Sequence, residues 1–386
     1  MSSQQVEYSS PPAGLSPCHD PDWLPGFYTH ILSQSITANI RKVVRIVGTD
    51  PSLLVTATRL LTAQKKAARR REMLAAEDVQ VPAVVMFSLT HQCNLACHGC
   101  YMRSLHPVMA PEMSSADIRN LTSQCVDLGV SFLVLAGGEP LVRKVEILML
   151  AREFPSMLFA IFTNGLLIDE SLAAEIGKKK NIVPILSIEG DREATDSRRS
   201  GGVYDAAIRS FSLLRQNGIF FGCSVTVSSK NFTEVTSDRF VKEMISFGCR
   251  LITFVEYVPI EEETSDVTLS DDQHNLLNNI LSGFSDLYPA LIIGFPGDEE
   301  AFGGCLSAGR GFVHISPSGD LEPCPAAPIS DVNVTQIPLR EALKSDLLAK
   351  IRANHHILSE SGGGCALWAN RGWVQSLLAP GQSNLE

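Results

Sequence analysis

Between residues 83 and 258, short apolar runs alternate with longer segments of helical periodicity. The apolar runs are rich in Val, Ile, Leu and Phe and are bounded by polar or turn residues, which is typical of buried strands. Six such strands are expected, at 83–90, 132–136, 158–163, 182–188, 221–227 and 251–258.

The segments between these strands place apolar residues three or four positions apart, which is the period of an amphipathic helix. The first segment, 114–129, begins with serines that can act as N-caps and ends with a glycine that can act as a C-cap. Strands that alternate with helices predict parallel βαβ units with right-handed crossovers, and therefore an α/β fold. The remaining helices are expected at 145–154, 170–179, 206–218 and 238–248.

The composition indicates a cytoplasmic protein. The opening MSSQQVEYSSPPAGLSP has neither the basic nor the apolar region of a signal peptide, and the chain contains no run of 18 apolar residues. Ten cysteines in 386 residues are too few for a disulfide scaffold. Clustered cysteines in such a chain favour metal binding.

Three cysteines follow the first expected strand directly, as Cys93, Cys97 and Cys100 in HQCNLACHGCY. Structural zinc takes four ligands, usually from two C-x2-4-C pairs, whereas this spacing stops at three thiols. A zinc site completed by His91 or His98 remains an alternative. Thiolates also hold iron–sulfur clusters, and a four-iron cluster on three thiolates keeps one iron open. An open iron favours catalysis over electron storage.

CNLACHGCY, in which the aromatic Tyr101 follows the third cysteine, resembles the signature of radical S-adenosylmethionine (SAM) enzymes. The resemblance implies a 4Fe-4S cluster on Cys93, Cys97 and Cys100 whose open iron binds SAM. It also implies an electron donor such as flavodoxin or ferredoxin, cleavage of SAM to a 5′-deoxyadenosyl radical, and hydrogen abstraction from a substrate. The implied fold is a partial (β/α)6 barrel, with the chemistry at the carboxyl ends of its strands.

Polar residues follow the other expected strands, and the resemblance assigns several of them to SAM. In AGGEP the two glycines let the backbone approach a ligand closely, although the segment is also an ordinary strand-to-helix turn. Two residues in SIEGD lie on one face of their strand, and one of two neighbouring arginines would bind the SAM carboxylate. The candidates are Gly137, Gly138, Glu139, Pro140, Asn164, Ser187, Glu189, Arg198 and Arg199.

The last expected strand carries one catalytic candidate. Glu256 and Tyr257 point to opposite faces, so one of them enters the barrel. A carboxylate inside a barrel is costly unless it is paired, which makes Glu256 a candidate for substrate contact. A residue at the rim of the sheet is the alternative.

Three further cysteines, Cys305, Cys324 and Cys365, lie beyond the expected barrel. Residues 311–325 predict a short hairpin around the turn PSGD. The spacing from Cys305 through Gly319 to Cys324 resembles the start of the SPASM or Twitch extension. A full SPASM extension has more cysteines, so the resemblance implies one auxiliary 4Fe-4S cluster. Buried free thiols are the alternative.

The N-terminal region concentrates positive charge in a chain whose net charge is −10, a balance that argues against a nucleic-acid partner. Residues 36–73 hold nine Lys or Arg and two acidic residues, and they predict two helices. A lid packed on the barrel, with a solvated basic face, is favoured over peripheral contact with an anionic membrane.

The predicted organisation is a disordered leader at 1–20, a helical arm at 21–82, the barrel at 83–286 and the auxiliary domain at 287–386. The arm lacks the strand pattern of a leader-peptide-binding domain, so a small-molecule or lipid-linked substrate is expected. A peptide-modifying maturase and, from another class, a non-catalytic iron–sulfur or zinc protein are the alternatives.

Overall fold

The computed structural model describes residues 35–39, 41–43, 46, 51–106, 108, 110–296, 304–358 and 365–378. The expected disorder of residues 1–20 lies outside this part of the chain. Among the described residues, no helix is both long enough and apolar enough to cross a membrane.

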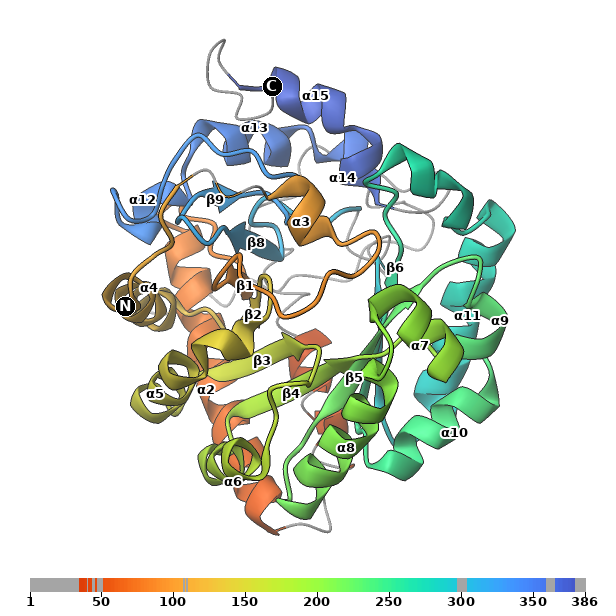
Figure 1. Ribbon diagram of the computed structural model, residues 1–386. Coiled ribbons are helices and arrows are strands. Elements are labelled where there is room, and N and C mark those ends of the chain that lie inside the picture. Colours follow the sequence, from red (N-terminus) through yellow and green to blue (C-terminus); the bar gives the residue numbers. More distant parts are fainter. Residues whose placement is uncertain are drawn as a thin grey trace.

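One sheet of nine strands organises the described chain, in the order β7-β6-β5-β4-β3-β2-β1-β8-β9 (Figure 1). All neighbours are parallel except β8 and β9, which form an antiparallel hairpin. The strands are β1 Val84–Ser88, β2 Phe132–Ala136, β3 Leu158–Thr163, β4 Ile182–Ser187, β5 Gly222–Val227, β6 Leu251–Glu256, β7 Leu291–Phe295, β8 Phe312–Ile315 and β9 Leu321–Glu322.

Several of the helices that follow β1 to β6 begin and end at the residues that local chemistry favours. Ser114 and Asp117 form a capping box at the start of α4, and Gly129, with φ of 87°, ends it. The barrel helices lie outside the curved sheet in Figure 1. They are α4 Ser115–Leu128, α5 Lys144–Glu153, α6 Glu170–Lys179, α7 Arg192–Arg199, α8 Val203–Gln216, α9 Phe232–Val235, α10 Asp238–Phe247 and α11 Asp271–Leu287.

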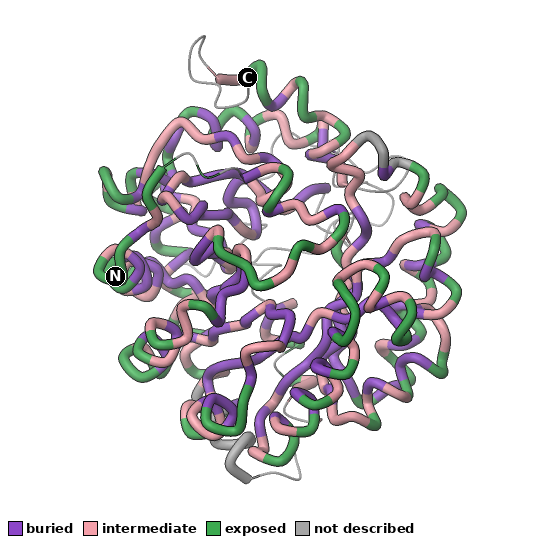
Figure 2. The backbone as a smooth tube through the Cα atoms, viewed as in Figure 1, coloured by how far each residue is buried: buried purple, intermediate pink, exposed green. Residues whose placement is uncertain are grey.

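Alternate residues of each strand face two different layers. On β4, Ile182 and Leu186 join the main core under the outer helices, whereas Val183 and Ile185 join a smaller apolar cluster with Leu251 on the inner face. Figure 2 shows the buried residues gathered along the strands and the exposed residues on the outer helices. Residues at the inner-face end of a strand are therefore the ones that can line a site.

All six predicted strands are present, but the sheet extends further at both edges. β7 pairs with β6, and β8 pairs with β1 in parallel, so the predicted 311–325 hairpin also closes onto the first strand of the barrel. Sequence periodicity could not predict these pairings, because the partners are far apart in the chain. The partner of β7 lies 40 residues earlier, and the partner of β8 lies more than 220 residues earlier. The domain boundaries of the sequence analysis stay predictions.

The basic helix of the N-terminal arm is α2 Pro51–Ala75, which packs against α4. Its Arg71 is 1% exposed and donates to the backbone oxygen of Gly129 and, at 2.8 Å, to Ser131 Oγ. Lys65, Lys66 and Arg69 are exposed. The helix is thus docked on the outer helical layer with exposed basic residues, and the lid interpretation stays a prediction.

The helices that follow the sheet lie in the C-terminal region at the top of Figure 1. They pack over β8 and β9 through buried leucines such as Leu347 and Leu367. They are α12 Leu339–Ala342, α13 Asp346–Ala353, α14 Ala366–Ala369 and α15 Arg371–Ser376.

Candidate active site

The cysteine loop joins the carboxyl end of β1 to α3 Tyr101–Leu105, and Cys100 is the N-cap residue of that helix. The Cys93 thiol is exposed, and those of Cys97 and Cys100 are half-buried. Burial raises the pKa of Cys93, and the nearby Cys97 and Cys100 raise it further. All three are free thiols, so they are available as ligands.

The AGGEP turn packs directly on the cysteine loop. Gly138 N donates to Thr90 O at 2.7 Å, and Glu139 N donates to Gln92 O at 2.8 Å. A Cβ added to Gly138 would lie 2.2 Å from Gln92 O, so only glycine fits this contact. A Cβ added to Gly137, whose φ is 121°, would lie 2.6 Å from Thr90 O. The two glycines therefore permit close approach of backbone to backbone, which fixes the path of the loop.

Glu139 joins the ends of two strands. It is 1% exposed, and its carboxylate accepts hydrogen bonds from Thr163 Oγ1 at 2.7 Å, Asn164 N at 2.9 Å and Leu141 N at 3.0 Å. Burial raises its pKa, while the Asn164 amide opposes that shift. Pro140 is buried at the first position of the short 3-10 helix η2 Pro140–Arg143. The carboxylate that was expected to face SAM is engaged with the end of β3.

Asn164 ties β3 to the cysteine loop. Its Nδ2 donates to Asn94 Oδ1 at 2.7 Å, and its own Oδ1 accepts from Leu166 N at 3.0 Å. Asn94 lies between the first two cysteines. The Asn-Gly turn after β3 is therefore part of the scaffold around the loop.

Glu189 pairs with both candidate arginines. It is 2% exposed, and its Oε1 accepts from Arg198 Nη1 at 2.7 Å and from Arg199 Nε at 2.7 Å. Burial alone would lower the pKa of Arg198, but the ion pair with Glu189 outweighs it, so the pKa of Arg198 is raised. Ser187, half-buried, lies two residues earlier at the end of β4. The structure brings all four predicted residues of this segment to one edge of the sheet.

The arginine pair also reaches the cysteine loop. His98 N donates to Arg198 O at 2.9 Å, so the loop is bonded to the end of α7. Burial raises the pKa of Cys97, and Arg199 and Arg198 lower it in turn. Two guanidinium groups beside a thiol stabilise its thiolate form, which is the form that binds iron. Three thiols of one exposed loop, beside fixed positive charge, fit a 4Fe-4S cluster with one open iron.

The structure separates Glu256 from the cysteine loop. Its Oε1 lies 2.8 Å from Nδ1 of His274 on α11, in the outer helical layer. Tyr257 takes the inner position instead: a Cβ on Gly99 would lie 2.2 Å from its hydroxyl, and Arg198 lies 5.9 Å from its ring centre. Of the two residues, Tyr257 is therefore the one that contacts the cysteine loop.

Tyr101 packs edge-on against His106, with ring centres 6.1 Å apart, and burial raises its pKa. It lies one residue after Cys100, and its phenol interacts with Ser88 at the end of β1. The aromatic residue after the third cysteine is therefore part of the wall between the loop and β8.

The C-terminal cysteines lie on three segments that hydrogen bonds connect. Cys305 is buried, while Cys324 and Cys365 are half-buried. Cys305 N donates to Leu358 O at 3.3 Å, and Ala308 N donates to Pro323 O at 3.1 Å. Asn370, at the end of the helix that Cys365 begins, donates to Ile357 O at 3.4 Å.

Sequence reasoning missed several residues that hold the site together. Glu112 accepts from the backbone of His91 at 2.7 Å, and Asn231 donates to Glu189 O at 2.9 Å. Arg198 Nη1 donates to Thr226 Oγ1 at 2.8 Å. Thr226 lies near the end of β5 and Asn231 follows that strand, so position at or after a strand end is the signal that could have found them.

The profile of the radical SAM superfamily matches residues 87–242. The chain is 31% identical over 155 residues to Fe-coproporphyrin III synthase of Methanosarcina barkeri, which covers 39% of this chain and 39% of that relative. It is 23% identical over 317 residues to AdoMet-dependent heme synthase of the same organism, covering 73% of this chain and 88% of that relative.

Among solved structures, SuiB of Streptococcus suis bound to S-adenosylmethionine superposes with a TM-score of 0.60 at 17% identity, over 76% of this chain and 73% of SuiB. This likeness shows the fold, and it confirms the predicted partial barrel. Residues 87–242, with the cysteine loop at the carboxyl end of the first strand, therefore form a radical SAM domain.

Proposed function

We propose that this chain is an enzyme that cleaves SAM reductively and abstracts a hydrogen atom from a small-molecule or lipid-linked substrate. The observation that carries the proposal is the position of the three free thiols, held at the inner edge of the sheet by AGGEP, Asn164 and Arg198. When bound, a 4Fe-4S cluster and SAM together supply one-electron reductive chemistry.

The chain's own residues have three tasks in this proposal. Cys93, Cys97 and Cys100 hold the cluster, and the loop contacts of AGGEP orient them. Arg198 or Arg199 binds the SAM carboxylate, while Glu189 keeps both guanidinium groups in place. Tyr257 covers the loop at Gly99 and limits the access of water. The catalytic role predicted for Glu256 is the least supported part, because that carboxylate faces His274.

The relatives support a small molecule as substrate. The relative that is matched over 88% of its length is named an AdoMet-dependent heme synthase. SuiB, which is also known in a structure bound to the precursor peptide SuiA, resembles this chain in fold. A peptide substrate is therefore the second candidate. An electron donor such as flavodoxin or ferredoxin belongs to either version.

One auxiliary 4Fe-4S cluster on Cys305, Cys324 and Cys365 completes the proposal. Support comes from the hydrogen bonds that join the three segments. We also propose a cytoplasmic location, with any membrane contact confined to the exposed basic side of α2.

The test is anaerobic reconstitution with iron and sulfide, followed by SAM, dithionite and product analysis. Wild-type protein is expected to form 5′-deoxyadenosine slowly even without substrate, and Cys97→Ala is expected to form none. Cys125→Ala, which removes a thiol buried in α4, is the matched control and should retain turnover. Undiminished turnover in Cys97→Ala would overturn the proposal. Deuterium transfer from labelled tetrapyrrole or peptide then separates the two substrate classes.

A further inference from the structure

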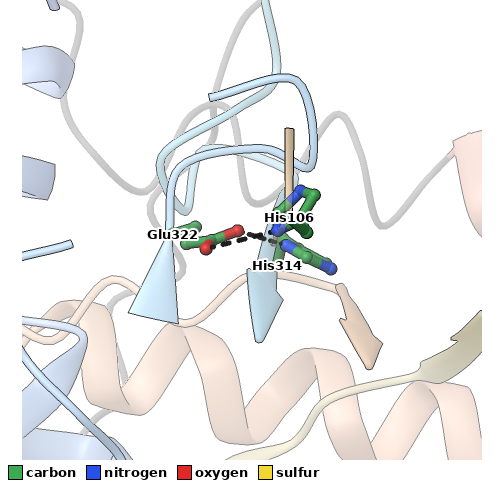
Figure 3. Close-up of side chains that lie close together, drawn as sticks. All are labelled: His106, His314 and Glu322. Atoms are coloured by element: carbon green, nitrogen blue, oxygen red, sulfur yellow. Dashed lines mark hydrogen bonds and ion pairs between the residues drawn. The ribbon is translucent and has the colours of Figure 1, made fainter. Parts of the chain in front are cut away.

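Three buried side chains outside the cysteine loop converge on one point. His106 follows α3, His314 lies on β8 and Glu322 lies on β9, and their exposed fractions are 6%, 0% and 4%. One potential ligand atom from each lies within 4.8 Å of the other two. Figure 3 shows both imidazole rings directed at the Glu322 carboxylate.

The outer nitrogen of each ring is already occupied. His106 Nε2 lies 2.9 Å from Pro325 O, a carbonyl that can only accept, so this nitrogen carries the proton. His314 Nε2 lies 2.7 Å from Ser88 Oγ, which holds this ring with its Nδ1 toward Glu322. The Nδ1 atoms of both rings therefore face Glu322.

Two ring nitrogens thus face one carboxyl group. His314 Nδ1 lies 2.6 Å from Glu322 Oε2, and His106 Nδ1 lies 3.8 Å from Glu322 Oε1, which is too long for a hydrogen bond. A proton on Glu322 satisfies one nitrogen only, whereas a divalent cation satisfies both and neutralises the buried carboxylate. Metal–ligand bonds of about 2.0–2.2 Å span these separations after small adjustments.

We propose that His106, His314 and Glu322 form a mononuclear site for a divalent first-row transition metal, Fe²⁺ or Zn²⁺, separate from the cysteines. Two imidazoles and one carboxylate suit these ions and leave coordination positions open. Hydrogen bonds from the outer ring nitrogens to Pro325 O and Ser88 Oγ are the contacts that orient metal-binding histidines. Because the ligands are buried, the ion enters as the chain folds.

The experiment counts metal against acid-labile sulfide in full-length protein purified anaerobically from cells grown with added iron and zinc. A 4Fe-4S cluster contributes iron and sulfide in equal amounts, so only a mononuclear site adds metal without sulfide. Wild-type protein is expected to carry an excess of about one metal per chain, in line with one three-ligand site. His106→Gln and Glu322→Gln should reduce that excess to about zero at unchanged sulfide.

His274→Gln is the matched control. It also removes a buried histidine that is paired with a glutamate, but the His274–Glu256 pair contains no second imidazole. It should keep the excess. Thermal melts followed by circular dichroism check that the variants fold. Should Glu322→Gln fail to fold, His106→Gln is the deciding variant, because His106 lies outside the β8–β9 hairpin. No excess in wild-type protein, or the same excess in His106→Gln, would overturn the site. Formation of 5′-deoxyadenosine is scored separately, so failure here is distinct from failure of the proposed function.

Discussion

The two groups of cysteines in this chain are built in different ways. Cys93, Cys97 and Cys100 come from one loop of eight residues after one strand, whereas Cys305, Cys324 and Cys365 come from three segments spread over about sixty residues. The first group is exposed or half-buried beside two arginines, whereas in the second Cys305 is buried and Cys324 and Cys365 are half-buried. The residues of a short loop are kept close by the chain itself, but the second group requires the β8–β9 hairpin and the helices to fold first.

This difference predicts that each group can be lost without the other. With both clusters present, about eight labile sulfides per chain are expected. Changing Cys93, Cys97 and Cys100 to alanine should leave about four sulfides and no 5′-deoxyadenosine. Changing Cys305, Cys324 and Cys365 should also leave about four, but with SAM cleavage in place. If the second triple variant keeps all its sulfide, the C-terminal thiols are structural.

Gly138→Ala tests whether the cysteine loop depends on its clamp. The new Cβ would meet Gln92 O at 2.2 Å, so the AGGEP turn or the loop must move. A displacement of about 1 Å at a reacting centre costs up to about 100-fold in rate, and a loss of this order is expected in 5′-deoxyadenosine formation. Gly201→Ala is the control, because nothing lies within 4 Å of its added Cβ. Equal activity in the two variants would show that the clamp is dispensable.

Glu189→Gln tests the charge arrangement beside Cys97. Removing one partner of a buried ion pair typically costs about 3–5 kcal/mol, and the lower end is expected because Arg198 and Arg199 keep some solvent contact. Chemical denaturation should report the loss, and calorimetry should show weaker SAM binding. Asp205→Asn breaks the exposed pair with Arg192 and should change neither measurement appreciably. Similar losses in both variants would show that Glu189 contributes no more to stability and SAM binding than an exposed ion pair does.

The smallest effect is expected on the N-terminal arm. Charge reversal of Lys65, Lys66 and Arg69, which are exposed on α2, should change neither the melting temperature nor SAM cleavage if the helix is a docked lid. Sedimentation with anionic vesicles measures the alternative. Salt-sensitive binding by wild-type protein that disappears in the variant, at about 1 kcal/mol per basic residue, would favour membrane contact. Arg71 is left unchanged because it is buried.

Much of the site could be predicted because its residues follow strands. Asn164, Ser187 and Glu189 each lie at or just after the end of a parallel strand, and the parallel register brings such ends together. The contacts between them could not be predicted. Glycines expected beside a ligand lie against the cysteine loop, and the carboxylate of Glu139 bonds the end of β3.

Position along a strand was also not enough to decide which of residues 256 and 257 faces the inside of the barrel. Alternation indicated that one of them enters the barrel but not which one, because the face depends on the twist and on what packs outside. α11 brings His274 to Glu256, and this contact leaves Tyr257 on the inner side. An error of one position exchanges the two faces, so such an assignment requires the packed structure.

By itself, the sequence determined the six βα units, the helix caps and the three-thiol loop, because periodicity, capping and close spacing act over a few residues. Only the tertiary structure decided the pairing of β8 with β1, and with it the meeting of His106, His314 and Glu322. His106 lies more than 200 positions before the predicted hairpin that carries the other two, and neither segment has a local sign of the other. They come together because β8 pairs with the edge of the sheet at β1, and no local sequence pattern predicts that pairing.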